Sequence, residues 1–277
     1  MISVLMTCYN REKFISESIQ SVLDSSYSNF ELIIVDDCST DNSYDIASEF
    51  ALKDNRVKVY KNIKNLGDYR NRNNAVTYSN FEYFTFVDSD DLIFEHTLET
   101  MVIAINQFPN IGVYIMTRNQ DKFNNRPYLL NSKEAFKTHF FVDGFLETGP
   151  LGTVYNKSIF QQLNGFSERR MTSDIDYFLR VTLNGSIVRL TSGLGYWRSH
   201  ENQESNHGFE YYVFDMVLIY KNVFKSEKFP LKKYKLYLLF RLYLSKCRDI
   251  MFFVYRTKKI KNLKYLYRLI SVREFIS

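Results

Sequence analysis

The chain has 277 residues, of which 45% are hydrophobic and 17% aromatic, so it is not a disordered protein and can bury a full core. Its three cysteines, Cys8, Cys38 and Cys247, have no CxxC or Cys/His spacing, which argues against a disulfide framework and a zinc site. The net charge of +5 is unevenly distributed, because residues 211–277 carry 16 Lys+Arg and 4 Asp+Glu (net +12) and residues 1–210 carry 20 and 27 (net −7). We expect the two regions to have different partners.

The first 120 residues alternate between strand-like and helical patterns. Helical spacing of apolar residues occurs at 15–23 and 98–105, between strand-like runs. This βαβ alternation predicts an α/β fold, a Rossmann-like, mostly parallel sheet flanked by helices. The strand-like runs are residues 2–8, 31–36, 57–61, 83–88 and 111–117.

The pattern is less regular from residue 120 to 170, and a helix is predicted at 174–184, ending before Gly185. From residue 211 onward the chain is helical, basic and aromatic, so we place a domain boundary near residue 210. The N-terminus has no signal-peptide pattern, and no apolar stretch reaches the ~20 residues of a membrane span. We therefore expect a cytoplasmic protein.

The stretch "VDSDD" places Asp88, Asp90 and Asp91 directly after a predicted buried strand. Carboxylates this close disfavour one another's ionised forms unless a cation or several donors compensate. Capping of the following helix explains one or two of them, but not three. An EF-hand loop would need Gly in place of Ile93, and a haloacid dehalogenase-type phosphatase would need Thr or Val in place of Leu92. The favoured interpretation is a D-x-D site for Mg²⁺ or Mn²⁺.

These acidic groups follow the carboxyl ends of predicted parallel strands, where such sheets bind ligands. Neither GxGxxG nor GxxxxGK[ST] is present, so a metal ion is the candidate to neutralise a bound phosphate. A second acidic pair, Asp36 and Asp37, ends the strand in "LIIVDDCSTDNS". Such a pair could bind a ribose or a base edge, or it could simply form a structural turn.

Four stretches in order resemble the family 2 glycosyltransferases, which have the GT-A nucleotide-sugar-binding fold. They are "SVLMTCYNREKFISESIQSVLDSSYSNFELIIVDDCSTDNS", "NLGDYRNRNNA", "FTFVDSDDLI" and "SDIDYFLRVTLNG". The resemblance covers roughly residues 1–200, so it implies a GT-A catalytic domain at 1–210, followed by a helical, basic and aromatic region at 211–277.

The resemblance also implies roles for individual residues. Asp37 would accept the N–H of the base, supported by Asp36, and Asp90 would bind the metal. Arg72 matches the arginine of an A-R-N motif, although Asn71 replaces the usual small residue. The donor-binding residues implied in this way are Thr7, Tyr9, Asn10, Asp36, Asp37, Arg72, Asp88 and Ser89.

The stretch "SDIDYFLR" is similar to the family's E-D-x-D-L-x-x-R segment, with Ser173 where Glu is usual, so Asp174 aligns with the catalytic base. Two helical residues this far apart point about 200° from one another, so Asp174 and Asp176 cannot serve one site equally. Asp176 and Arg180 form an i,i+4 pair, which could simply stabilise the helix by ~0.3 kcal/mol.

The stretch "GYWRSHENQES" resembles the family's Y-R-x-H segment. The resemblance implies that His200 completes the metal sphere or touches the diphosphate, although an isolated histidine can equally be a packing or surface residue. Trp197 either stacks on a sugar or belongs to the core.

These expectations combine into an inverting, metal-dependent glycosyltransferase that uses Mn²⁺ or Mg²⁺. It would move a hexosyl or N-acetylhexosaminyl group from a nucleotide-diphosphate sugar, expected to be a UDP-sugar, to a saccharide or lipid-linked acceptor in cell-surface polysaccharide or glycoconjugate synthesis. A nucleotidyltransferase would need a Gly-rich N-terminal loop that is missing. The alternative from another class is a non-catalytic nucleotide-sugar-binding or scaffold subunit.

The basic, amphipathic pattern of the C-terminal region predicts contact with an anionic membrane surface, on the inner face of the cell membrane. In "KKIKNLKYLYRLI" basic residues fall on one helical side and apolar residues on the other. The alternative is packing on the catalytic domain or on a second copy, which leaves homo-oligomers open, and the charges spread around the helix at 231–248 favour this alternative there. Nucleic acid is not expected. The basic set is Lys258, Lys261, Lys264 and Arg268, and the apolar set is Ile260, Leu263, Tyr267 and Ile270.

Overall fold

The computed structural model describes residues 1–117, 126–200, 209–257 and 265. The chain divides into two compact units. The first comprises Met1–Glu168 and Ser173–His200, and the second comprises Arg169–Thr172 and the chain from Glu201 onward. The main break therefore follows His200, ten residues before the predicted boundary.

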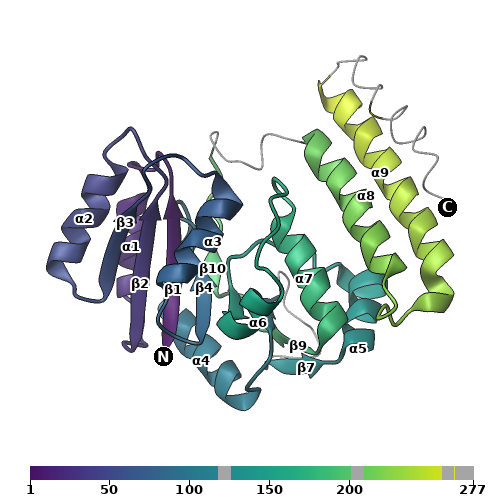
Figure 1. Ribbon diagram of the computed structural model, residues 1–277, viewed down its shortest axis with the longest axis horizontal. Helices are drawn as coiled ribbons and strands as arrows, with labels where there is room; N and C mark the ends of the chain where they lie inside the picture. The colour runs from purple at the N-terminus through teal and green to yellow at the C-terminus, as the bar shows by residue number, and fades with distance from the viewer. Residues whose placement is uncertain (118–125, 201–208, 258–264, 266–277) are drawn as a thin grey trace. The chain divides into compact units, whose positions relative to one another are not determined.

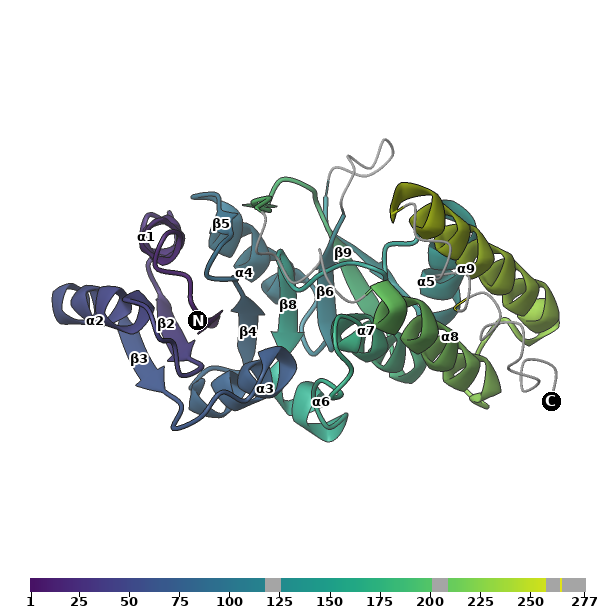
Figure 2. The same ribbon diagram turned by 90° about the horizontal axis from the view of Figure 1, so that it is seen from above.

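The first unit is built on a sheet with the strand order β3-β2-β1-β4-β8-β6-β9-β7 (Figures 1 and 2). The four strands β3, β2, β1 and β4 are parallel, whereas β8 pairs antiparallel with both β4 and β6. Beyond them, β9 is parallel to β6 and β7 is antiparallel to β9, so the sheet is mixed. The strands are β1 (Ile2–Cys8), β2 (Phe30–Asp36), β3 (Val57–Lys61), β4 (Tyr83–Phe86), β6 (Val113–Met116), β7 (Tyr128–Leu130), β8 (Thr153–Asn156) and β9 (Ile187–Leu190). Two short strands, β5 (Leu92–Ile93) and β10 (Gly195–Tyr196), form a separate antiparallel pair.

Helices cover both faces of this sheet (Figure 2). The helices α1, α2 and α4 lie on one face, and α3, α6 and α7 lie on the other. Since both faces are covered, the parallel strands can be apolar along their whole length. The helices are α1 (Ile15–Leu23), α2 (Ser43–Lys53), α3 (Asp68–Tyr78), α4 (Thr97–Gln107), α5 (Ser132–Thr138), α6 (Lys157–Gln162) and α7 (Ser173–Asn184), with a π-helical turn η1 (His139–Asp143) after α5.

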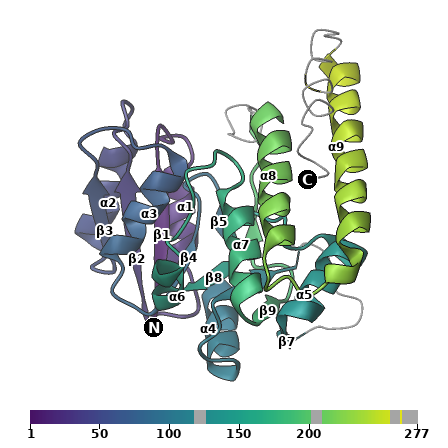
Figure 3. The ribbon, with the colours of Figure 1, turned by 45° about the vertical axis from the view of Figure 1, so that its right-hand side comes forward.

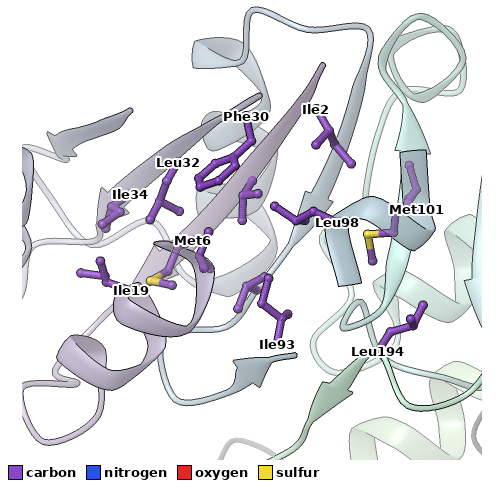
Figure 4. Packing of buried hydrophobic residues seen from close by; sticks show 14 of the residues in the cluster. Ile2, Met6, Ile19, Phe30, Leu32, Ile34, Ile93, Leu98, Met101 and Leu194 are labelled. Atoms are coloured by element: carbon purple, nitrogen blue, oxygen red, sulfur yellow. The ribbon is translucent and has the colours of Figure 1, made fainter. Parts of the chain in front are cut away.

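The main core lies between the first face and its helices (Figure 4). Ile2 and Met6 of β1 project to this face because side chains alternate along a strand. They pack in one buried cluster with Ile19 of α1 and with Leu98 and Met101 of α4. The apolar residues of both helices recur at helical spacing, which is why α1 and α4 bury one stripe each.

Aromatic residues fill the space beneath the second face. Phe86 of β4, Tyr155 of β8 and Phe166 lie within 5.8 Å of one another, measured between ring centroids. Tyr177 of α7 joins them, 5.7 Å from the Phe166 ring. This packing fixes the first turns of α7 against the sheet.

The register brings the carboxyl ends of three strands to one edge. Cys8 at the end of β1 is opposite Asp36 at the end of β2, and Leu5 is opposite Phe86 at the end of β4. The loops that follow these strands therefore start side by side, and they contain most of the predicted site residues.

The second unit contains a helical hairpin, α8 (Phe209–Lys225) and α9 (Lys235–Thr257), joined through a 3₁₀ turn η3 (Lys232–Tyr234) (Figure 3). Val213 and Val217 of α8 and Ile250 of α9 form the buried contact between the two helices. Within the described residues, no helix is both long enough and apolar enough to span a membrane.

Candidate functional site

Three carboxylates cluster after β4. Asp88, Asp90 and Asp91 each offer one oxygen, and these oxygens lie within 4.8 Å of one another. Burial, reinforced by the negative charge of Asp88, raises the pKa of Asp91 to about 8. Burial also raises the pKa of Asp88, against the lowering effect of Arg72. A set of three carboxylates whose ionisation is disfavoured by burial and by one another suits a divalent cation of the Mg²⁺ or Mn²⁺ kind, which would stabilise the ionised forms.

Asp90 is held by two side chains on one of its oxygens. Arg11 Nε donates to Asp90 Oδ2 at 2.9 Å, and His200 Nε2 lies 2.9 Å from the same oxygen. The His200 ring stacks on Phe14, with 4.7 Å between ring centroids. The structure thus places His200 beside Asp90, where it fixes the orientation of the carboxylate.

Arg72, on α3, connects the carboxylate cluster to the rest of the site. Its Nε donates to Asp68 Oδ1 at 2.7 Å, and its Nη2 lies 2.7 Å from Asp88 Oδ1. The side chain is buried, and among the described residues its Nη1 has no hydrogen-bond partner. A buried cationic donor with an unused N–H suits an anionic ligand.

The departure at Asn71 has a structural explanation. Its side chain Nδ2 donates to the carbonyl of Val35 at 3.1 Å, and its Oδ1 accepts from Asn62 Nδ2 at 2.9 Å. Asn71 therefore ties α3 to the end of β2 and to the loop after β3.

The acidic pair after β2 is engaged with nearby loops. Asp37 Oδ1 accepts from Asn62 Nδ2 and from the backbone of Leu66, both at 2.8 Å, and Oδ2 accepts from the backbone of Gly67 at 2.9 Å. Asp37 thus uses three of about four acceptor positions to hold this loop. Asp36 Oδ1 accepts from the backbone of Ser39 at 3.0 Å, while its Oδ2 is buried without a partner in the described part of the chain.

The remaining predicted donor residues lie at the same edge. Thr7 is half-buried near the end of β1, and Tyr9 is exposed just beyond it. Asn10 has a φ of 53°, and its Oδ1 accepts from the backbone of Thr40 at 2.9 Å. Ser89 is buried within the acidic loop. The loops after β1, β2 and β4 are therefore interlocked.

Asp174 lies in the first turn of α7 and is buried. Burial raises its pKa to about 7, while hydrogen bonds from the Ile175 backbone and the Tyr69 hydroxyl, and the charge of Arg72, lower it. A carboxyl group with this pKa can exchange a proton near neutral pH. Arg72, which pairs with Asp88, therefore acts electrostatically on Asp174 as well as on the acidic cluster.

Asp176, two residues further along α7, has a different environment. Its Oδ2 accepts from Arg180 Nε at 2.9 Å, and Arg180 Nη2 donates to the carbonyl of Gly165 at 2.7 Å. The pair holds α7 to the turn after α6. Asp174 and Asp176 therefore face different surroundings, as their helical positions require.

The sequence interpretation missed three residues that the structure brings to this site. Arg11 directly follows Asn10 in the loop after β1. Tyr69 precedes Arg72 by three residues, so Tyr69 and Arg72 lie on the same face of α3. Arg198 donates its backbone N–H to Asp91 Oδ1 at 3.0 Å. The core alternative for Trp197 is wrong, because the side chain is 59% exposed.

Comparisons with known proteins agree with this arrangement. Residues 3–163, more than half of the chain, match the family model described as glycosyl transferase family 2. The chain is 40% identical over 107 residues to the glycosyltransferase GlyG of Streptococcus pneumoniae, a match that covers 39% of this chain and 36% of that protein. It is also 35% identical over 125 residues to the UDP-Glc:alpha-D-GlcNAc-diphosphoundecaprenol beta-1,3-glucosyltransferase WfgD of Escherichia coli, covering 45% and 47% of the two chains. The chain thus spans less than half the length of these two relatives.

A solved structure supports the fold over almost the whole chain. The mannosyltransferase PcManGT from Pyrobaculum calidifontis, in complex with GDP-Man and Mn²⁺, matches with a TM-score of 0.69 and 14% identity, covering 99% of this chain and 81% of that one. The predicted GT-A fold is confirmed.

Proposed function

The chain belongs to glycosyl transferase family 2, and on that basis we propose that it transfers a sugar from a nucleoside diphosphate sugar to an acceptor hydroxyl group. One observation carries the proposal: a carboxylate cluster suited to a cation pairs with Arg72, whose charge also acts on Asp174, a separate buried carboxyl group with a pKa of about 7. The catalytic domain is proposed as residues 1–210.

The donor would lie across the loops at the strand ends. Asp36 and Asp37 would receive the base and ribose, which is supported by the unpartnered buried oxygen of Asp36 and the one acceptor position left on Asp37. Arg72 would use its unpaired Nη1 on the donor phosphates. We propose a UDP-sugar with a hexosyl or N-acetylhexosaminyl group, which is supported by the UDP-Glc named for the relative WfgD. The other proposed donor contacts are Thr7, Tyr9, Asn10, Asp88 and Ser89.

A divalent ion would be held by Asp88, Asp90 and Asp91, whose oxygens already converge. Bound there, Mn²⁺ or Mg²⁺ would neutralise the charge that develops on the departing diphosphate. Arg11 and His200 would keep Asp90 oriented by holding its Oδ2. The Mn²⁺ and GDP-Man in the PcManGT structure support a metal of this kind.

Asp174 would act as the base. Its carboxylate would accept the proton of the acceptor hydroxyl while the acceptor oxygen bonds to the anomeric carbon. The bond from that carbon to the diphosphate oxygen breaks, and the electron pair leaves with the nucleoside diphosphate. A single displacement of this kind inverts the anomeric configuration. Tyr69 would keep the Asp174 carboxylate oriented through their hydrogen bond.

We propose a saccharide or lipid-linked acceptor, in the synthesis of a cell-surface polysaccharide or glycoconjugate. Two exposed aromatic side chains, Tyr196 and Trp197, precede Arg198, whose backbone contacts Asp91. They would offer stacking surfaces to an acceptor sugar. The diphosphoundecaprenol acceptor named for WfgD supports a lipid-linked substrate.

Incubation with a panel of nucleotide sugars and Mn²⁺ tests the proposal, with release of nucleoside diphosphate as the measurement. A transferase should release it from at least one donor, and faster when acceptor is present. Donor binding without release, by this chain and by Asp90→Asn alike, would instead identify the non-catalytic donor-binding subunit. The variant serves as the control because it removes a proposed metal ligand while keeping the side-chain shape.

A further inference from the structure

The outer face of α9 lacks the acidic side chains that usually cover an exposed helix. Among the described side chains of α9, nine are exposed: seven are apolar or aromatic and two are arginines. Leu236 is 80% exposed and Tyr255 is 82% exposed. The full set is Leu236, Tyr237, Phe240, Arg241, Leu244, Arg248, Met251, Phe252 and Tyr255. Large contiguous apolar surfaces are rare on monomeric soluble proteins and mark interaction sites.

Most of these side chains form one continuous stripe, which we call the α9 stripe: Leu236, Phe240, Leu244, Arg248, Met251 and Tyr255. Successive members are three or four residues apart, so they lie on one side of the helix. At 1.5 Å per residue the stripe is about 28 Å long. It is distinct from the side of α9 that packs on α8 through Ile250.

The charge around the stripe is net positive. Lys232 and Lys233, in the turn before α9, are exposed, as is Arg248 within the stripe. Asp249 is the only acidic residue of α9: its Oδ2 accepts from the buried Lys246 at 3.1 Å, and its Oδ1 lies 3.9 Å from Arg248 Nη2. One partly exposed carboxylate therefore serves two cations of the helix, and an excess of positive charge remains.

We propose that the α9 stripe docks α9 in the plane of an anionic phospholipid bilayer. Apolar side chains would enter the boundary between headgroups and acyl chains, while Arg248, Lys232 and Lys233 meet lipid phosphates. Charge argues against a second copy of the chain, because antiparallel self-pairing of the stripe would bring the Arg248 side chains of the two copies close to one another, and like charges at an interface repel. The helix would lie on the membrane, since it is not apolar enough to cross it.

Membrane contact was expected from the sequence at residues 256–277, of which Arg256, Thr257 and Tyr265 fall within the described part of the chain. The stripe lies upstream of that segment. Docking does not depend on the proposed transfer reaction, because vesicle binding is measured without donor or acceptor.

Flotation of the full chain with phosphatidylglycerol/phosphatidylcholine vesicles, and with phosphatidylcholine vesicles alone, tests the proposal. We expect binding to the anionic vesicles that weakens with salt. Phe240→Ser/Leu244→Ser should lower vesicle affinity by about tenfold or more, because it removes apolar area at the centre of the stripe. Arg248→Glu should also lower vesicle affinity, and the loss should be larger at low salt than at high salt.

The matched control is Leu52→Ser/Ile63→Ser, which removes two exposed apolar side chains from the first unit. It should bind vesicles like the unmodified chain. The proposal is overturned if the unmodified chain does not float at low salt, or if the stripe variant binds as well as the control. It is also overturned if the stripe variant changes only the molar mass in light scattering, which would identify the stripe as a contact between copies. Circular dichroism checks that each variant is folded.

Discussion

The acidic edge of the sheet and the α9 stripe differ in the sign and the burial of their charged side chains. At the sheet edge, carboxylates such as Asp91 and Asp174 are buried, and burial raises their pKa values. On α9 the charges of one sign are exposed and stand beside apolar side chains. Buried charges respond strongly to a proton, a cation or a bound phosphate, so they suit chemistry. Exposed charges act over a Debye length and suit attraction to a surface.

The comparison implies that the two regions can be separated experimentally. Variants at the sheet edge should alter metal binding and turnover while leaving vesicle binding unchanged. Variants of the α9 stripe should weaken vesicle binding while leaving metal binding, and turnover with a soluble acceptor, unchanged. Each of the following changes at the sheet edge challenges or refines that separation.

The largest effect is expected from Asp90→Asn. It removes one carboxylate of the cluster and its charge-assisted bond to Arg11, so it should abolish transfer and metal-dependent donor binding. Mn²⁺ titration followed by electron paramagnetic resonance measures the metal directly, and vesicle flotation should remain normal. Transfer by this variant in EDTA at the unmodified rate would contradict the metal role.

Asp174→Asn should act on turnover alone. It keeps the shape of the side chain but removes the base, so kcat should fall by about 10²-fold or more with donor affinity nearly unchanged. Steady-state kinetics and donor titration separate the two quantities. Near-normal turnover would show that another group takes the proton.

Stability offers an independent check on the same residue. The folded-state pKa of Asp174, about 7, is above its ordinary value of 3.8, so the folded protein binds the proton more tightly than the unfolded one. The contribution of Asp174 to the free energy of unfolding should therefore decrease as pH rises from about 4 to about 7, and then level off. Urea unfolding of the unmodified chain and of Asp174→Asn at pH 5 and pH 8 measures this. The free energy of unfolding of the variant, relative to that of the unmodified chain, should be higher at pH 8 than at pH 5.

The parallel half of the sheet is readable from the sequence mainly because β1 and β2 are buried along almost their whole length, whereas the edge strand β3 is only partly buried. The strands β1 and β3 coincide with their predicted ranges, and β2 begins only one residue earlier. The antiparallel strand β8 was missed, although it separates β4 from β6. Its four residues, Thr153–Asn156, have no local signature, and its place is decided by pairing with strands distant in the sequence.

The site follows the same division. Asp88 and Asp90 stand out because like charges rarely crowd after an apolar strand. Arg11 does not, since a single arginine in a loop has no pattern, and only the fold brings it to Asp90, 79 residues away. The i,i+4 pair of Asp176 with Arg180 could be read from the sequence, whereas the contact of Asp174 with Tyr69, on a different helix, could not.

Arg11→Ala is expected to have an intermediate effect. It leaves the three carboxylates in place but removes a donor that orients Asp90, so Mn²⁺ affinity should fall by about 10- to 100-fold. Calorimetric Mn²⁺ titration without donor measures this. Arg11→Lys should recover part of the affinity, because it restores the charge without the planar donor. Unchanged affinity in the alanine variant would mean that His200 alone positions Asp90.

Tyr69→Phe should shift a pH profile more than a maximal rate. The hydroxyl of Tyr69 and the charge of Arg72 lower the pKa of Asp174, whereas the charge of Asp68 raises it. The charge of Asp174 in turn raises the pKa of Tyr155. Without the hydroxyl the Asp174 pKa rises, so the ascending limb of kcat/KM, expected near pH 7, should move to higher pH. A limb at the same pH would assign it to another group.

The smallest effect is expected from Asp176→Asn, the matched partner of Asp174→Asn on the same helix. Asp176 and Arg180 form a partly exposed pair, with side chains 17% and 29% exposed, so solvent screens their attraction. Arg180 also donates to the carbonyl of Gly165, a bond that the substitution leaves intact. The free energy of unfolding should therefore fall by about 1 kcal/mol or less, as measured in urea. Turnover should remain near normal, since Asp176 faces the turn after α6 and Asp174 faces Tyr69. Turnover as low as in Asp174→Asn would move the base to Asp176, and the chemistry would then use a partly exposed carboxylate.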